Sequence, residues 1–178
     1  MEWISSCIRS RFLKNKINTV LIGGFNQNEV LQLANLTKQY PVDVRFIELM
    51  PMYDGGDFGP EAFISYQDVL KQLPQLKPVE NDGGVAKLYR FPNALGNVGL
   101  ISPLNAHFCG SCNRLRVTAD GKVKPCLHSN IEFNIKGLSL EEMIEQMKQA
   151  VYAKPAHHKE LSYHQRSDAG RTMNQIGG

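Results

Sequence analysis

The run Ile17-Asn18-Thr19-Val20-Leu21-Ile22 decides the fold class that we predict for this chain. It is short, apolar and β-branched and is followed by two glycines, as expected for a buried strand of a parallel sheet. Asn26 and Glu29 then indicate a helix start, and apolar side chains recur on one helical face until Pro41. Residues 42–50 are then predicted to form a second strand. The segment therefore predicts a β-α-β unit, in which functional side chains gather at the carboxyl ends of the strands.

Two strands can neither close a barrel nor bury both of their faces, so this first part is expected to be the end of something larger. The rest of the chain mixes both element types, which makes the predicted class α/β to α+β. The predicted elements are a helix from Ser65 to Pro74, strands over 86–91 and 98–102, a hairpin of 113–118 and 123–127 around Asp120-Gly121, and an amphipathic helix opened by Ser139 and Glu142.

Composition narrows the class of protein. The chain has 178 residues, 42% of them hydrophobic, and a net charge of +3. That balance allows a sizeable core, and it gives no reason to expect nucleic-acid binding. No apolar run approaches the ~20 residues that span a bilayer, and no export signal is visible at the N-terminus. We therefore expect a cytoplasmic protein with no membrane partner.

Three of the four cysteines form the most informative cluster in the sequence. Cys109 and Cys112 lie in His107-Phe108-Cys109-Gly110-Ser111-Cys112-Asn113-Arg114-Leu115-Arg116, and Cys126 follows. Clustered cysteines in a chain without an export signal favour metal binding over disulfides. The residues alone leave two alternatives open. One is a structural zinc completed by His107 or His128, and the other is an iron–sulfur cluster that has three protein thiolates and one open position.

Arg114 and Arg116 follow this motif directly. In a strand, alternation places these two side chains on one face and Leu115 on the other. Two parallel guanidiniums suit a polyphosphate or a carboxylate, since each can donate bidentate hydrogen bonds. The alternative is that they neutralise a negative metal centre or lie solvated on a hairpin.

Four segments together resemble one family: Lys16-Ile17-Asn18-Thr19-Val20, Arg45-Phe46-Ile47-Glu48-Leu49-Met50-Pro51, the cysteine segment from His107 to Gly121, and the terminal Ile176-Gly177-Gly178. In this order they look like the GTP 3',8-cyclases of molybdenum cofactor biosynthesis. The cysteine segment is the most specific of the four. The resemblance favours a [4Fe–4S] cluster over zinc.

The resemblance implies a fold and an activity. Members of that family are radical S-adenosylmethionine lyases, built on a partial (β/α)₆ barrel with a C-terminal extension, that convert GTP to 3',8-cyclo-7,8-dihydro-GTP. Residues 1–52 would then be the remnant of the barrel, and residues 53–178 the molybdenum cofactor synthesis C-terminal domain that carries the auxiliary cluster.

The resemblance also implies roles for individual residues. Those carried over are the cluster ligands Cys109, Cys112 and Cys126; the GTP contacts Lys16, Arg114, Leu115 and Arg116; the S-adenosylmethionine contact Met50; and a C-terminal tail, Gly177 and Gly178, that reaches the active site. Two residues without side chains suit such a tail sterically.

One departure from the family is large. The family's N-terminal C-x₃-C-x₂-C motif is absent, because Cys7 is the only cysteine before Cys109. We therefore expect a chain that corresponds to the C-terminal half of the enzyme, lacks part of the S-adenosylmethionine site and is inactive alone. Its expected partners are GTP and either further copies of itself or a missing N-terminal half. The alternative is a non-enzymatic Cys₃His zinc-binding or nucleotide-binding module.

Overall fold

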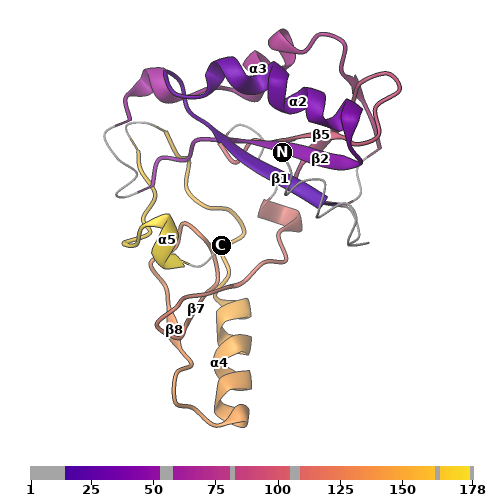
Figure 1. Ribbon diagram of the computed structural model, residues 1–178. Coiled ribbons are helices and arrows are strands. Elements are labelled where there is room, and N and C mark those ends of the chain that lie inside the picture. The colour runs from indigo at the N-terminus through magenta and orange to yellow at the C-terminus, as the bar shows by residue number, and fades with distance from the viewer. Residues whose placement is uncertain (1–14, 53–57, 81–82, 105–108, 163–164, 177–178) are drawn as a thin grey trace. The chain divides into compact units, whose positions relative to one another are not determined.

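The computed structural model describes five stretches of the chain: 15–52, 58–80, 83–104, 109–162 and 165–176. The chain divides into two compact units (Figure 1). Unit 1 consists of Met1–Leu49 and Gly59–Asn105, and unit 2 of Met50–Phe58 and Ala106–Gly178. Compact units and family domains are different divisions of a chain, so the predicted domain boundary after residue 52 stays a prediction.

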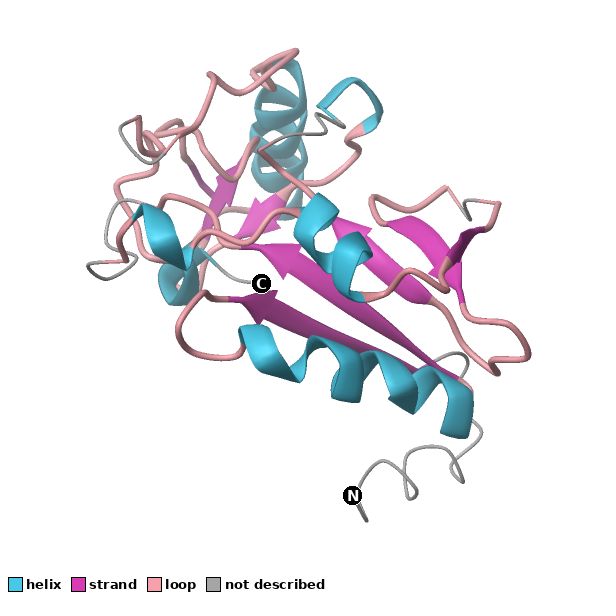
Figure 2. Cartoon of the chain, turned by 90° about the horizontal axis from the view of Figure 1, so that it is seen from above, coloured by secondary structure: helices cyan, strands magenta, loops and turns pink. Residues whose placement is uncertain are grey.

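Unit 1 begins with the β-α-β segment, as predicted. Strand β1 (Asn15–Leu21) is followed by a short 3₁₀ helix, η1 (Gln27–Glu29), helix α2 (Val30–Gln39) and strand β2 (Val42–Glu48). The two strands pair in parallel along their full lengths. Figure 2 shows the long strands of this sheet side by side, with their arrowheads pointing the same way.

The turn between β1 and η1 differs from the predicted helix cap. Asn26 does not cap the helix with its side chain. Its Oδ1 instead accepts a hydrogen bond from the Ile22 amide at 2.8 Å, and its Nδ2 donates to the Val20 carbonyl at 2.9 Å. An asparagine amide has both a donor and an acceptor, so it can close a loop onto the end of the preceding strand.

The remaining strands extend the sheet in mixed orientation. The elements that follow are η2 (Pro60–Ala62), α3 (Tyr66–Gln72), β3 (Lys77–Pro78), β4 (Lys87–Arg90) and β5 (Val98–Ile101). The strand order is β1-β2-β5-β4-β3, with β5 parallel to β2 and the last two strands antiparallel. The fold class is therefore mixed α/β with a parallel sheet at its centre. A barrel stays a prediction.

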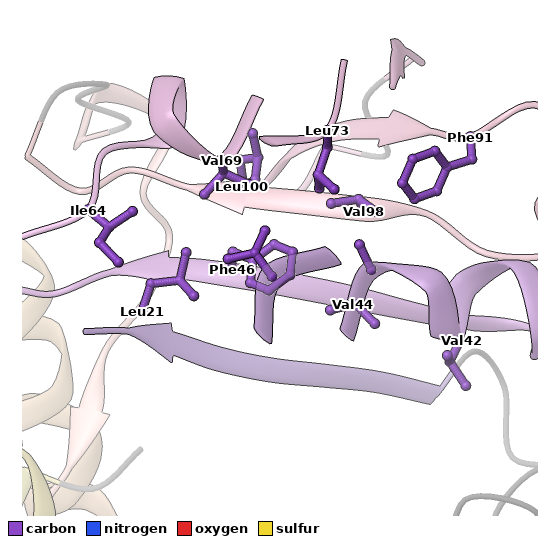
Figure 3. Close-up of a cluster of buried hydrophobic side chains, with 12 residues drawn as sticks. Leu21, Val42, Val44, Phe46, Ile64, Val69, Leu73, Phe91, Val98 and Leu100 are labelled. Atoms are coloured by element: carbon purple, nitrogen blue, oxygen red, sulfur yellow. The ribbon is translucent and has the colours of Figure 1, made fainter. Parts of the chain in front are cut away.

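Helices α2 and α3 pack on one face of this sheet. Val44 and Phe46 of β2 and Val98 and Leu100 of β5 contribute to the core under the helices, together with Val69 of α3 (Figure 3). These side chains alternate along their strands, so the opposite face carries the intervening residues. The helix predicted from Ser65 is present as α3, and Ser65 caps it in a capping box with Asp68.

Glu48 links the end of β2 to two neighbours in unit 1. Its side chain is 3% exposed. One carboxylate oxygen accepts from the Tyr66 amide at 3.0 Å, at the start of α3, and the other accepts from the Ser102 hydroxyl at 2.7 Å. A buried carboxylate needs such donors, and the positive end of the helix dipole adds to its stabilisation.

Replacing Glu48 with alanine should therefore destabilise unit 1. Loss of the carboxylate leaves the Tyr66 amide and the Ser102 hydroxyl without their acceptor, which costs about 1–3 kcal/mol for each unsatisfied buried group. Urea unfolding of Glu48→Ala and of Glu80→Ala, a control at an exposed glutamate, measures the effect. Equal midpoints for the two variants would contradict this role of Glu48.

Unit 2 is built from short elements. They are η3 (Cys109–Ser111), β6 (Arg116–Val117), β7 (Lys122–Lys124), β8 (Phe133–Asn134), α4 (Leu140–Tyr152) and α5 (Met173–Ile176). The three strands form an antiparallel sheet in the order β6-β7-β8, and α4 packs against β7 and β8. Among the helices of the described stretches, none combines the length and apolar character needed to cross a bilayer.

The strands β6 and β7 are shorter than the sequence predicts. They meet at a turn in which the Thr118 amide donates to the Lys122 carbonyl at 2.8 Å and the Gly121 amide to the Thr118 carbonyl at 3.0 Å. Gly121 has φ +83°, which favours glycine. Arg114 lies before β6 and Cys126 after β7, so neither residue is part of a strand.

Helix α4 starts with the predicted Ser139–Glu142 capping box. Its apolar pattern is also present, but the pattern is not a buried face. Ala150 is the buried residue of this helix. Leu140, Ile144 and Val151 are exposed among the described residues.

Candidate metal and nucleotide site

Cys109 and Cys112 lie on one short turn of unit 2. The Cys112 amide donates to the Cys109 carbonyl at 3.1 Å, which closes the 3₁₀ turn η3. Cys126 follows β7, and its carbonyl accepts from the Ser129 amide at 3.3 Å. All three cysteines are free thiols and partly buried.

Lys154 connects the two cysteine-bearing segments. It follows helix α4, and its ammonium donates to the Arg114 carbonyl at 2.8 Å and to the Pro125 carbonyl at 3.0 Å. Arg114 is two residues after Cys112, and Pro125 directly precedes Cys126. One cation therefore bridges the two backbone stretches just beyond the paired residues of β6 and β7.

Arg116 lies within electrostatic reach of two of the thiols. Burial lowers the pKa of its guanidinium below the ordinary value, and the neighbouring charge of Arg114 lowers it further. Cys112 and Cys126 act in the opposite direction and raise the same pKa. This places a half-buried cation within electrostatic reach of Cys112 and Cys126.

The pair of arginines differs from the predicted arrangement. Arg116 opens β6 opposite Lys124, whereas Arg114 is exposed and outside the strand. Strand alternation therefore does not apply to both residues, although the two like charges lie close enough for Arg114 to lower the pKa of the Arg116 guanidinium. Leu115 between them is partly buried.

His128, one of the two candidate histidines for zinc, is buried. Its Nδ1 lies 3.0 Å from the Ser167 hydroxyl, and its ring centroid lies 4.8 Å from that of His158. Burial lowers the pKa of His128 to about 4, with the His158 and Arg116 charges acting in the same direction. The imidazole is therefore neutral at pH 7. The other candidate, His107, lies outside the described residues.

The three thiols suit a metal by their chemical type, although the described side chains are not arranged around a common point. In the described parts of the chain, no group of three or more thiol, imidazole or carboxylate side chains is arranged to hold a metal ion. Three free thiols with a cation beside two of them still match the three-thiolate ligand set of an iron–sulfur cluster.

The structure describes two further residues that were predicted to contact ligands, one in each unit. Lys16 is exposed on β1, in register with Asp43 of β2. Met50 follows β2 and packs against the small core of unit 2 that contains Met52, Ala169 and Ile176. Gly177 and Gly178, the predicted tail, lie outside the described residues.

Arg45 was not among the predicted site residues. It pairs in register with Asn18 of β1 and Gly99 of β5, on the face opposite the helices and two residues from Asp43 along β2. Its Nε is buried and has no hydrogen-bond partner among the described residues. The alternation of the β2 sequence could have identified it, since Lys16 and Arg45 belong to one face.

A second set of charges supports the turn of the hairpin. Arg171 donates to both oxygens of Glu132, at 2.6 and 2.9 Å, and to Asp120 at 2.8 Å. Lys124, which is 1% exposed, donates to the Ser129 carbonyl at 2.7 Å and to Glu132 at 3.2 Å. Glu132 therefore neutralises a buried lysine and ties the C-terminal segment to the sheet.

Comparison with known proteins shows the family of this chain. The Molybdenum Cofactor Synthesis C family matches residues 42–160, more than half of the sequence. The chain belongs to this family.

Several relatives are GTP 3',8-cyclases. The chain is 42% identical to that of Alkaliphilus oremlandii and 40% identical to that of Alkaliphilus metalliredigens, each over all of this chain and 57% of the relative. It is 50% identical to that of Peptoclostridium acidaminophilum over 68% of this chain and 38% of the relative. The chain thus spans little more than half the length of the two Alkaliphilus relatives and corresponds to their C-terminal portion.

Replacing Lys154 with methionine should separate the two cysteine segments. A hydrogen bond from a charged donor contributes about 1.5–3 kcal/mol, and 1.4 kcal/mol is a factor of ten in an equilibrium constant. We expect the metal-free Lys154→Met chain to bind a trivalent arsenical, which bridges neighbouring thiols, about tenfold more weakly. Lys136→Met, at an exposed lysine of the same unit, is the control. Unchanged arsenical affinity in Lys154→Met would show that the thiols do not depend on this lysine.

The Glu132 network predicts a dependence of stability on pH. Hydrogen bonds from Arg171 are the main cause that lowers the pKa of Glu132 to about 2, from an ordinary value of 4.5. The stabilisation is therefore complete above about pH 4.5 and is lost as the pH falls through about 2. Glu132→Gln should unfold more easily at pH 7 and lose less stability between pH 4.5 and 2 than the parent chain. Parallel acid-unfolding curves for the two proteins would contradict this assignment.

Proposed function

We propose that this chain is the nucleotide-binding and cluster-bearing portion of a GTP 3',8-cyclase. Such an enzyme is a lyase that converts GTP to 3',8-cyclo-7,8-dihydro-GTP by S-adenosylmethionine radical chemistry in molybdenum cofactor biosynthesis. The observation that carries this proposal is the similarity of the whole chain to proteins with that name. The cytoplasm would be its compartment.

Three cysteines would hold the cluster in this proposal. Cys109, Cys112 and Cys126 would ligate a [4Fe–4S] cluster, which, when bound, supplies an open iron position to the purine base of GTP. The chain's own contribution is to position the three thiols and to place cations beside them. Lys154 supports this role through its two carbonyl contacts, and Arg116 through its position near Cys112 and Cys126.

GTP would be bound by cationic side chains. Arg114 and Arg116 would donate to its phosphates, with Leu115 between them in contact with the nucleotide, because guanidiniums bind phosphate oxygens bidentately. Lys16 would add a further cation from β1. The Nε of Arg45, which is buried and has no hydrogen-bond partner among the described residues, supports an anion at the same face of the sheet. Met50 would contact S-adenosylmethionine, and the Gly177-Gly178 tail would complete the site.

The same proposal makes the chain inactive by itself. The sequence contains no C-x₃-C-x₂-C motif, so the cluster that cleaves S-adenosylmethionine has no ligands here. GTP contacts retained by this chain contribute binding and no turnover.

A zinc module is the second candidate, and one observation favours it. The Nδ1 of His128 contacts the Ser167 hydroxyl at 3.0 Å. Histidines that ligate a metal through one ring nitrogen commonly hydrogen-bond through the other, which orients the ring. His128 with the three cysteines would then give a closed Cys₃His site, without an open position for a ligand.

Metal analysis after anaerobic purification and reconstitution separates the two candidates. About four irons per chain with a brown colour supports the cluster, and one colourless zinc supports the closed site. A GTP-dependent change in the spectrum of the iron-loaded chain would support the open position. Full iron loading without any response to GTP would contradict it.

Removing the two guanidiniums tests nucleotide binding separately. The double variant Arg114→Ala/Arg116→Ala should lower GTP affinity by at least tenfold, because each charge-assisted contact contributes about 1.5–3 kcal/mol, and should keep its iron content. Lys136→Met controls for the loss of positive charge. Loss of iron in the double variant would assign the arginines to the cluster rather than to GTP.

With S-adenosylmethionine, GTP and a reductant, the parent chain should form no 5'-deoxyadenosine above the blank.

A further inference from the structure

The C-terminal stretch 165–176, which we call the strap, contacts two parts of unit 2 that are far apart in the sequence. One part is the segment 50–52, which follows β2 and begins with Met50. The other is the turn 126–129, which follows β7 and begins with Cys126. A stretch of chain that contacts both parts restrains the position of one relative to the other.

Ser167 makes the polar contacts of the strap with these two parts. Its side chain is buried, with 5% exposed. Its amide donates to the Pro51 carbonyl at 2.9 Å, and its hydroxyl lies 3.0 Å from Nδ1 of His128. The same hydroxyl accepts from the Ala169 amide at 3.2 Å. A hydroxyl can donate one hydrogen bond and accept two, so Ser167 can serve both of these partners at once.

His128 carries the effect of this contact to the cysteine. The ring is 7% exposed and belongs to the turn that the Ser129 amide closes on the Cys126 carbonyl at 3.3 Å. Movement of this turn would draw the buried ring away from the Ser167 hydroxyl and leave its nitrogen without that partner, which costs free energy. The hydroxyl therefore limits the positions that Cys126 can adopt.

Ile176 makes the apolar contact of the strap. It is completely buried and lies in the small core with Met52. Met50 and Leu127 pack against the same core, and Leu127 directly follows Cys126. This core therefore joins the strap to the segment 50–52 and to the turn 126–129.

The middle of the strap is itself tied to the hairpin. Arg171 donates to Glu132 and to Asp120, and the Gly170 amide donates to Oδ1 of Asn130 at 2.9 Å. These contacts hold the backbone of the strap in place. Its remaining side chains therefore act from a fixed support.

We propose that Ser167 and Ile176 are positioning residues of the candidate site, which hold the turn of Cys126 at a set distance from the segment that carries Met50. The inference rests on the proposed function for the roles of Met50 and Cys126. The other two cysteines lie on a different turn, η3, so they provide an internal reference for a test.

Alkylation of the metal-free full chain, resolved by residue with mass spectrometry, tests Ser167. Ser167→Ala should raise the rate at Cys126 about tenfold relative to the two cysteines of η3, because buried polar groups lose a partner and the turn opens more often. Ser167→Thr keeps the hydroxyl and should restore the parent rate. Ser162→Ala, at an exposed serine, should change no rate. Unfolding would raise all three rates together, so a selective increase reports the position of Cys126. Equal rates at Cys126 in the parent chain and Ser167→Ala, or in Ser167→Ala and Ser167→Thr, would overturn the role of the hydroxyl.

Ile176→Ala tests the apolar contact, because it leaves a cavity in the core that joins the strap to both parts. It should raise alkylation of Cys126 and peroxide oxidation of Met50 about threefold or more. Met147 on α4, 38% exposed, is the reference for oxidation. Ile176→Val removes a single methylene group and should give the same pattern with smaller increases, which keeps the test valid if the alanine variant does not fold. Unchanged rates at Cys126 and Met50, or an equal increase at Met147, would overturn the role of Ile176.

Iron loading separates this inference from the proposed function. Ser167→Ala should take up as much iron as the parent chain under anaerobic reconstitution and lose it to a chelator about tenfold faster, because one ligand is held less firmly. Equal rates of iron loss would contradict the role of Ser167 at a cluster. A chain that takes up no iron but shows the selective alkylation would contradict the proposed function and support the effect of the strap on Cys126.

Discussion

The contact of Lys154 with two carbonyl groups is the interaction on which the organisation of unit 2 depends. The lysine follows α4 and reaches the backbone on both sides of the hairpin, at Arg114 and at Pro125. Short strands contribute few ladder hydrogen bonds, and the apolar cluster around Ile176 is small. In unit 2, hydrogen bonds from charged side chains therefore hold together segments that apolar packing holds together in larger cores. Removing one partner of such a contact leaves polar groups unsatisfied, which is why each is expensive to lose.

Unit 1 is held together mainly by apolar packing rather than by charged side chains. Its parallel strands bury apolar side chains under α2 and α3, and Glu48 is a buried exception with two donors. The other face of the same strands carries Lys16 and Arg45. One face of the sheet therefore forms the apolar core under the helices, and the other face carries these two cationic side chains. This separation follows from strand alternation alone.

Much of unit 1 could be predicted from the sequence because its signals are local. The strand patterns of β1 and β2, the helix between them and the helix start at Ser65 depend on residues close together in the chain. The Asn26 turn could not be predicted as it is, because its side chain can cap a helix or bind the preceding strand, and the folded loop decides between them.

The site was less predictable because its contacts join distant residues. Lys154 occupies an ordinary helix end in the sequence, and its partners are 29 and 40 residues away. The cysteine ligand set was visible from spacing, but whether the three sulfurs converge depends on the backbone between Cys112 and Cys126. The spacing of apolar residues predicted the apolar side of α4. It could not predict what packs against that side, because an amphipathic pattern does not identify the contacting surface.

Ile176 has a practical consequence for work with this protein. Its side chain is completely buried beside Met52 and Ala169, and only two glycines follow it in the sequence. Any purification tag or fluorescent fusion appended after Gly178 would begin within about 11 Å of this anchor, since each residue of extended chain spans at most about 3.6 Å. Fusions at the other terminus, or a long glycine–serine spacer, keep such additions from pulling on the anchored helix α5.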